Sequence, residues 1–221
     1  MIQRHTQHAN DWRNVLLAVL LATAPAAPAE PGPANAAADE AAERALGARL
    51  DEIAQLSGRF RQTVYPEAGG RASVSKGEFR LQSPGRFLWR IDAPDNQLVV
   101  TQGEYLWHYD ADLQTATRRP IDAAASAPLQ VLAGDRESLA RDFAVTRSGE
   151  ASYTLIPRNA DAGFRSLELT LDAGIPRELT IVDNLSQRIE ISLDAVSTDA
   201  IDADVFDFTP PDGVDVFIHD A

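Results

Sequence analysis

Residues 75 to 91 read SKGEFRLQSPGRFLWRI, and this stretch decides which class of fold the chain adopts. Apolar and polar residues alternate on both sides of a turn at residues 83–86, which contains a Pro-Gly pair. The apolar residues that share one parity are Phe79, Leu81, Phe87, Trp89 and Ile91. Alternation with a period of two, interrupted by a Pro-Gly turn, predicts a β-hairpin with one apolar face.

The same pattern recurs along most of the chain at intervals of about ten residues, which is typical of an all-β fold. Turn residues such as Asp183-Asn184 separate the apolar runs. The expected strands are 60–65, 74–82, 86–92, 97–101, 104–109, 114–118, 142–147, 152–157, 164–172, 176–182 and 187–193. So many strands in succession predict one large antiparallel sheet that curls or closes.

Two regions interrupt the strand pattern and are expected to be helical. Residues 41–56 place apolar residues at helical spacing, and Ser57-Gly58 is expected to end this helix. Residues 120–141 contain a second helical stretch, closed by Gly134, and a further helical turn. A mainly β fold with two helical segments suggests that the helices cover the concave side of the sheet.

The N-terminus has the features of an export signal. Val15 to Ala24 form an unbroken apolar run, and small residues at positions 27 and 29 suit cleavage near Ala29. The run is too short for a permanent membrane anchor. We therefore expect a signal peptide at 1–29, a flexible Pro/Ala-rich leader at 30–40, one domain at 41–221 and a periplasmic location.

Charge and cysteine content exclude several classes of function. After the expected cleavage the chain has 18 basic and 32 acidic residues, a net charge of −14. This charge opposes binding to nucleic acid or to an anionic bilayer. The chain has no cysteine, so it has no disulfide, no zinc-thiolate site and no cysteine that could carry a lipid anchor.

The sequence contains no recognisable catalytic constellation. Only two histidines, His108 and His219, follow the expected cleavage site, and they lack metal-ligand spacing. Motifs of metalloproteases, serine hydrolases and nucleotide-binding folds are absent. The aspartates lie mainly at predicted turns, where Asp is a common residue. His108 is interpreted as a strand residue, not as a ligand. We expect no enzyme activity, no cofactor and no metal site.

The strands supply many apolar residues, and these leave two interpretations open. In one, all of them form an ordinary core under the helices. In the other, a curved sheet with aromatic residues on its inner face leaves an unfilled apolar hollow, which barrel-like folds commonly use for ligands. The strand pattern predicts that Phe79, Leu98, Leu106 and Trp107 face this hollow.

Several blocks of the sequence, in order, resemble the bacterial lipoprotein carrier family LolA. They are GEFRLQSPGRFLWRID, PDNQLVVTQGEYLWHYDADLQTATRRPID, APLQVLAGD, YTLIPR, IVDNLSQRIEISL and DVFDFTPPDGVDV. Together they span about 75–217. The last block and the central LWHYDADL are the most specific.

The resemblance implies an open, eleven-stranded antiparallel half-barrel with helices as a lid over a hydrophobic cavity. A family member is a monomeric periplasmic chaperone that shields the acyl chains of lipoproteins. It accepts them from an inner-membrane ABC transporter and delivers them to the outer-membrane receptor LolB. LolB-like receptors are themselves lipid-anchored, so the lack of cysteine favours the unanchored carrier.

The resemblance also assigns individual residues. Phe60, Phe87 and Trp89 match apolar positions that line or flank the cavity, whereas the lid positions are Leu129, Val131 and Leu132. One position departs from the family pattern, which often has an arginine before the proline of the hairpin to latch the lid. Here that position is Ser83, whose side chain is short and uncharged.

Two alternatives to a lipoprotein carrier remain at this point. Ser83 leaves room for a LolA-like carrier of another lipid or glycolipid. A sensor or structural β-domain with a solid core would also be compatible with the strand pattern.

Overall fold

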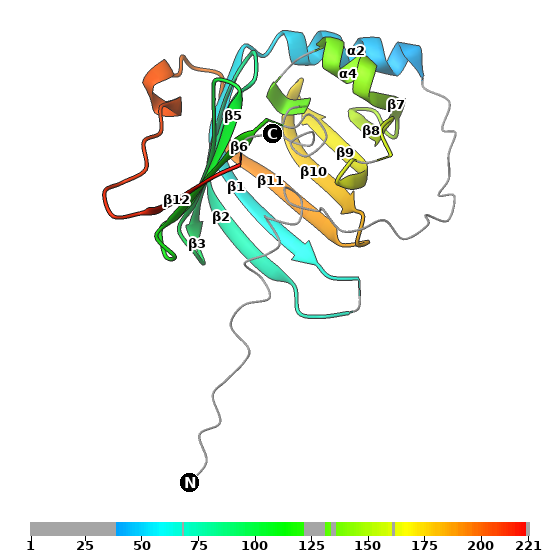
Figure 1. Cartoon of the computed structure of the whole chain (residues 1–221). Coiled ribbons are helices and arrows are strands. Elements are labelled where there is room, and N and C mark those ends of the chain that lie inside the picture. The colour runs from blue at the N-terminus through cyan, green and yellow to red at the C-terminus, as the bar shows by residue number, and fades with distance from the viewer. Residues whose placement is uncertain (1–38, 68, 122–130, 134–135, 161, 220–221) are drawn as a thin grey trace.

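The computed structural model describes residues 39–67, 69–121, 131–133, 136–160 and 162–219. Within these ranges, twelve strands form one sheet that curls into an open half-barrel. Two helices, α2 (Glu40–Asp51) and α4 (Arg136–Asp142), lie together across one end of the curled sheet (Figure 1).

The strand order places β1 in the middle of the sheet and β7 and β12 at its two edges. Neighbouring strands are antiparallel, except that β12 runs parallel to β6. The strands are β1 (Gln55–Tyr65), β2 (Ser73–Gln82), β3 (Arg86–Ala93), β4 (Gln97–Gln102), β5 (Tyr105–Asp110), β6 (Thr115–Pro120), β7 (Phe143–Arg147), β8 (Ser152–Pro157), β9 (Phe164–Asp172), β10 (Ile175–Asp183), β11 (Arg188–Ser197) and β12 (Asp215–Ile218).

Two shifts in strand register near the centre of this sheet, which bend it, occur at glycines. The register between β1 and β11 shifts around Gly58, and a Cβ on this residue would lie 2.8 Å from the carbonyl oxygen of Asp194. The register between β2 and β3 shifts at Gly77, where a Cβ would overlap the carbonyl oxygen of Arg90. Bulges increase local twist and bend a strand, and glycine permits the close backbone approach that they need.

The helices begin and end for local reasons. Asp39 caps α2, because its Oδ1 accepts hydrogen bonds from the backbone N–H groups of Ala41 at 2.9 Å and Ala42 at 3.1 Å. The buried side of this helix includes Leu46 and Leu50. Helix α2 contacts both α4 and β7, so it covers one edge of the sheet as well as the concave face.

The sheet carries apolar residues on both of its faces, in two separate clusters. The main cluster joins strand residues with those of α2, α4 and the short 3-10 helix η1 (Val131–Ala133), so it marks the helix-covered concave face. The second cluster contains Leu88, Val100 and Phe206 and lies on the opposite, convex face. Its cover is the C-terminal segment that contains the 3-10 helix η2 (Ala203–Phe206), which contacts β3 and β4.

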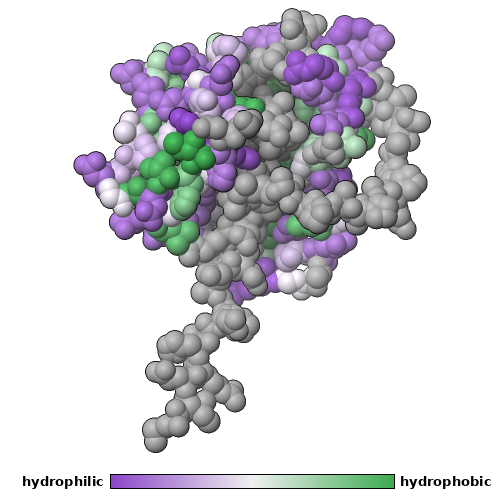
Figure 2. All heavy atoms as spheres, viewed as in Figure 1, coloured by the Kyte–Doolittle hydropathy of each residue, from purple (hydrophilic) through white to green (hydrophobic). Residues whose placement is uncertain are grey.

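The structure confirms the eleven expected strands, with ends that move by a few residues, and the open curled sheet. It adds a twelfth strand, β12, that the sequence did not predict and that is parallel rather than antiparallel. The residues Val216, Phe217 and Ile218 of β12 are 45%, 52% and 52% exposed. They belong to the apolar surface that Figure 2 shows on the side where β12 runs.

The predicted boundaries of the first helix were wrong at both ends. It starts at Glu40, inside the expected leader, and ends at Asp51 instead of Leu56. Ser57 and Gly58 do not end a helix; they lie within β1, because residues 55–59 pair with 78–82 of β2. Pairing with a neighbouring strand outweighs the helical spacing of these residues. The expected signal peptide and the helical stretch at 122–130 lie outside the described residues.

We expect Gly77→Ala to lower the free energy of unfolding by about 3 kcal/mol, because backbone, not a movable side chain, occupies the space of the new methyl group. Urea unfolding followed by circular dichroism measures this change. Gly149→Ala is a matched control, since its Cβ would lie 3.3 Å from the side chain of Ser152 and no closer than 3.9 Å to backbone, and it should cost about 0.5 kcal/mol. Equal stability of the two variants would contradict the steric role of Gly77.

Candidate functional site

Four aromatic side chains on β1, β2 and β3 form the centre of the concave face. Phe60 and Trp89 stack with ring centroids 3.7 Å apart and an angle of 22° between their planes. Phe79 and Phe87 flank Trp89 at centroid distances of 6.0 and 6.1 Å. All four residues are buried in the main cluster, so the sequence correctly placed them together on one face.

The stack of Phe60 on Trp89 crosses the intervening strand β2. Phe60 pairs with Gly77 of β2, and Trp89 lies on β3, on the far side of β2. Backbones separated by an intervening strand are about 9.6 Å apart, so the two rings must lean over β2 to meet.

Helical elements cover the aromatic centre. Val131 and Leu132 of η1 are 6% and 2% exposed and belong to the same cluster, and η1 contacts β2. Leu139 of α4 and Leu46 of α2 complete this cover. Two of the three expected lid residues therefore contact the predicted face, whereas Leu129 lies outside the described residues.

Two predicted cavity residues face the wrong side of the sheet. Leu106 belongs to the main cluster, as expected, but Leu98 and Trp107 pack in the second cluster on the convex face. The ring of Trp107 lies 5.5 Å from that of Phe208 in the C-terminal segment. The prediction failed because apolar residues of both parities occur on β4 and β5, and the segment that covers the second set is distant in sequence.

Ser83 lies where the β2–β3 hairpin meets the connection between α2 and β1. Its backbone N–H donates a hydrogen bond to the carbonyl oxygen of Ala54 at 2.8 Å. The nearby arginines have other partners: the exposed Arg86 donates to Gln82 Oε1 at 3.2 Å, and the Arg80 guanidinium lies 3.4 Å from the Glu78 carboxylate. The hairpin is thus attached through its backbone to the segment that leads from the helical cover.

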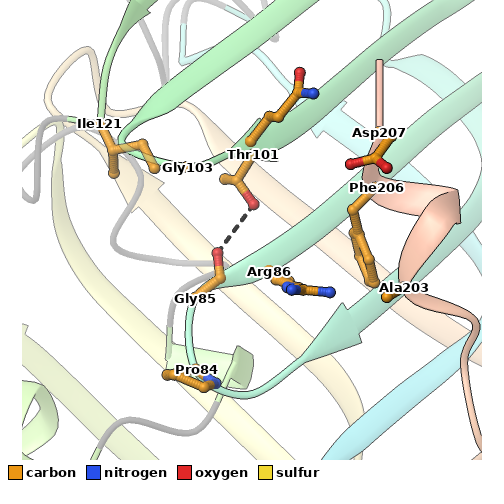
Figure 3. Close-up of a pocket in the computed structure, with 10 residues that line it drawn as sticks. Pro84, Gly85, Arg86, Thr101, Gly103, Ile121, Ala203, Phe206 and Asp207 are labelled. Atoms are coloured by element: carbon orange, nitrogen blue, oxygen red, sulfur yellow. Dashed lines mark hydrogen bonds between the residues drawn. The ribbon is translucent and has the colours of Figure 1, made fainter.

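A cleft of about 380 Å³ lies at the rim of the half-barrel (Figure 3). The turn at Gly85, the β4 residue Thr101 and the C-terminal residue Phe206 line it. Thr101 Oγ1 donates a hydrogen bond to the carbonyl oxygen of Gly85 at 2.9 Å, which fixes one wall. A second cleft, of about 470 Å³, lies beside α2 and is lined in part by Arg147 and Tyr153. Both clefts mix polar and apolar walls, and the second includes Tyr153 and Leu171 of the main cluster.

A row of polar side chains shares the concave face with the apolar cluster, which the sequence analysis missed. His108 and Asp110 have the same parity on β5 as Leu106, and Gln97 lies opposite Asp110 on β4. Gln97 Nε2 donates a hydrogen bond to Asp110 Oδ2 at 3.2 Å. Counting by twos from Leu106 would have placed these residues on the inner face.

The surroundings of His108 favour the neutral form of its imidazole. Burial lowers its pKa from the ordinary value of 6.5, the carboxylate of Asp110 raises it, and the guanidinium of Arg119 lowers it. Its Nε2 is buried and makes no hydrogen bond among the described residues. The indole Nε1 of Trp89 is also buried and makes no hydrogen bond among the described residues.

The described part of the chain contains neither a cluster of metal ligands nor a membrane-spanning helix. In the described ranges, no three or more His, Asp or Glu side chains are grouped so that they could hold a metal ion. No helix in those ranges is both long and apolar enough to cross a bilayer.

Comparison with known proteins places this arrangement in a family. Residues 51–209 match the family model described as outer membrane lipoprotein carrier protein LolA. A protein of Alkalilimnicola ehrlichii named outer-membrane lipoprotein carrier protein is 37% identical over 182 residues, covering 81% of this chain and 85% of its own length. A protein of Azotobacter vinelandii with the same name is 34% identical over 186 residues, covering 82% and 90%.

Among solved structures, an uncharacterised conserved protein from Thermus thermophilus has a similar fold. Its TM-score is 0.51 and its identity is 12%, with 82% of this chain and 100% of that chain covered. This likeness concerns the fold alone, whereas the family match covers most of the chain and the relatives exceed 30% identity. The chain belongs to the family of the outer membrane lipoprotein carrier protein LolA.

Proposed function

We propose that this protein carries lipoproteins through the periplasm and shields their acyl chains between the concave face and its helical cover. The observation that carries the proposal is the continuous apolar face on β1–β3, with the Phe60–Trp89 stack at its centre and short helical elements above it. The names of the relatives from Alkalilimnicola ehrlichii and Azotobacter vinelandii support the same function.

The energetics of the cargo require such a face. Three acyl chains contain about 45 methylene groups, and exposing them to water costs on the order of 35 kcal/mol. A shallow patch of surface cannot offset this cost. A face lined by apolar side chains on strands and helices can offset a large part of it.

The helical cover competes with the cargo for the same apolar surface. In the structure, Phe60, Phe87 and Trp89 are 3%, 7% and 2% exposed, so the cover must move before acyl chains can reach them. The cover includes η1 and α4, which are three and seven residues long. Competition of this kind lets a carrier release its load without ATP, because only a modest difference in affinity between carrier and receptor is needed.

We infer the partners and the location from the family. The donor is an inner-membrane lipoprotein-releasing ABC transporter, and the acceptor is an outer-membrane receptor of the LolB type. The signal peptide at 1–29 directs export, with cleavage near Ala29, and the carrier acts as a monomer without cofactor or catalytic activity.

Two alternatives are each favoured by one observation. Ser83, in place of the usual arginine, favours a carrier of another lipid or glycolipid. The low exposure of the concave-face residues favours a non-carrier sensor or structural domain with a solid core. Lipids that co-purify with the protein, identified by mass spectrometry, separate the first alternative from a lipoprotein carrier.

In cells, loss of this protein should leave outer-membrane lipoproteins at the inner membrane, because their acyl chains cannot cross the aqueous space unshielded. Fractionation of the envelope after depletion, with immunoblots of several lipoproteins, measures the outcome. Integral outer-membrane proteins without acyl chains provide the control. Normal sorting of every lipoprotein would contradict the proposed role.

The native protein should bind the apolar dye bis-ANS and release it when an acylated lipopeptide is added. A cover that opens gives dye and acyl chains access to the same face, whereas a solid core does not. Fluorescence titration at constant protein concentration measures both steps. Absence of native-state binding would favour the non-carrier alternative.

Replacing Trp89 by glutamate should reduce lipopeptide uptake at least tenfold and leave the fold largely intact, because a face that opens lets the carboxylate reach water. Trp107→Glu is the matched control, since Trp107 lies on the convex face, and its uptake should stay near that of the wild type. Uptake is measured by displacement of bis-ANS and folding by circular dichroism. If Trp89→Glu abolishes folding and uptake together, the residue belongs to a solid core.

A further inference from the structure

Two buried ring nitrogens on the concave face lack hydrogen-bond partners, and the residues that carry them occupy one row of paired strand positions. Trp89 of β3 pairs with Val99 of β4, and Val99 pairs with His108 of β5. Residues paired in this way stand on the same face, so Trp89 and His108 flank Val99 within the concave face. Among the described residues, neither Trp89 Nε1 nor His108 Nε2 has a hydrogen-bond partner.

Buried polar groups without partners are uncommon in folded proteins, and each calls for an explanation. The indole N–H of Trp89 can only donate a hydrogen bond, whereas the Nε2 of a neutral histidine donates or accepts according to its tautomer. A face that had to contact only methylene groups would need neither of them. Their position in the apolar centre therefore indicates a ligand that has polar atoms as well as acyl chains.

His108 has both apolar and charged neighbours on the concave face. Val99 and Leu106 belong to the main apolar cluster. Asp110 on the same strand and Arg119 on β6, which is the strand partner of Leu106, both act on the His108 imidazole. Asp110 is already engaged by Gln97 Nε2 and by the backbone N–H of Leu113. The imidazole thus lies at the boundary between apolar and polar lining.

We propose that Trp89 Nε1 and His108 Nε2 form a subsite for the carbonyl groups that join acyl chains to the polar head of the cargo. The inference rests on the proposed carrier function and deepens it. The acyl chains lie over the aromatic cluster of β1–β3. The ester and amide groups of the acylated cysteine lie at the Trp89–Val99–His108 row, and the head continues toward the polar zone of β5 and β6.

This subsite gives the cargo an advantage that the cover lacks. When the apolar cover closes on the face, the two nitrogens stay unpaired. When a lipid with carbonyl oxygens enters, both gain partners in a low-dielectric environment, where hydrogen bonds are strong. The carrier therefore prefers acyl linkages over plain hydrocarbon of the same length.

The test compares two lipopeptides that differ only in their carbonyl groups. One is a dioctanoylglyceryl-cysteine peptide with ester linkages, and the other is its dioctyl ether analogue, both short enough to remain dispersed. Dissociation constants are measured by displacement of bis-ANS from the full mature chain at pH 7.5. The wild type should bind the ester about tenfold more tightly than the ether, which corresponds to two modest net hydrogen bonds.

Variants assign this preference to the two nitrogens. His108→Leu should reduce the ester preference to about threefold, the loss of one such bond, with unchanged affinity for the ether. Trp89→Phe, which keeps a ring but removes the N–H, should also reduce the ester preference to about threefold; the readout is the ratio of the two affinities, because Trp89 also contacts the acyl chains. His108→Gln, which keeps a hydrogen-bonding group, should retain part of the preference. His219→Leu, at an exposed position after β12, should behave as the wild type.

The outcomes separate this inference from the proposed function. If the wild type binds ester and ether equally, or if His108→Leu weakens both equally, the carbonyl subsite is refuted and the carrier function stands. If the wild type binds neither lipopeptide, the carrier function fails and the subsite fails with it. Dioctanoyl phosphatidylcholine has the same ester groups on a different polar head. If it binds as tightly as the ester lipopeptide, the subsite recognises acyl esters in general. If it binds more weakly, the subsite is specific for lipoprotein cargo.

Discussion

The close contact between Gly77 and the backbone of β3 is the constraint on which the concave face depends. Without a side chain at this position, the register between β2 and β3 shifts and the backbones approach closely. Phe60, the strand partner of Gly77 on β1, stacks with Trp89 of β3 across β2. The glycine that accompanies the bend of the sheet thus lies beside its aromatic centre.

A bent sheet with an apolar concave face cannot remain uncovered in water, because the exposed surface would cost more than the cover loses in entropy. The chain supplies this cover from two places, α2 before the sheet and the η1–α4 region between β6 and β7. On the convex face, Leu88 and Val100 must also be shielded from water, and Phe206 of the C-terminal segment packs over them. The two covers come from different parts of the chain and pack on opposite faces of the sheet.

The sequence by itself determined the elements whose signals are local. Alternation over a few residues located the eleven antiparallel strands, and the ordered blocks led to the family. The hairpin at residues 75–91 placed Phe79, Phe87 and Trp89 on one face, because a tight turn fixes the register of its two strands. Pairing of residues far apart in the chain left no local signal, so β12 beside β6 was not foreseen.

Tertiary structure alone decided on which of the two sheet faces each apolar residue of β4 and β5 packs. Leu98 and Leu106 look equivalent in the sequence, yet they lie on opposite faces. The outcome depends on the C-terminal segment, which is distant along the chain and buries Leu98 and Trp107. It also decided that the Nε2 of His108 is buried and has no partner among the described residues, since burial is a property of the assembled sheet and its cover, not of the strand that carries the residue.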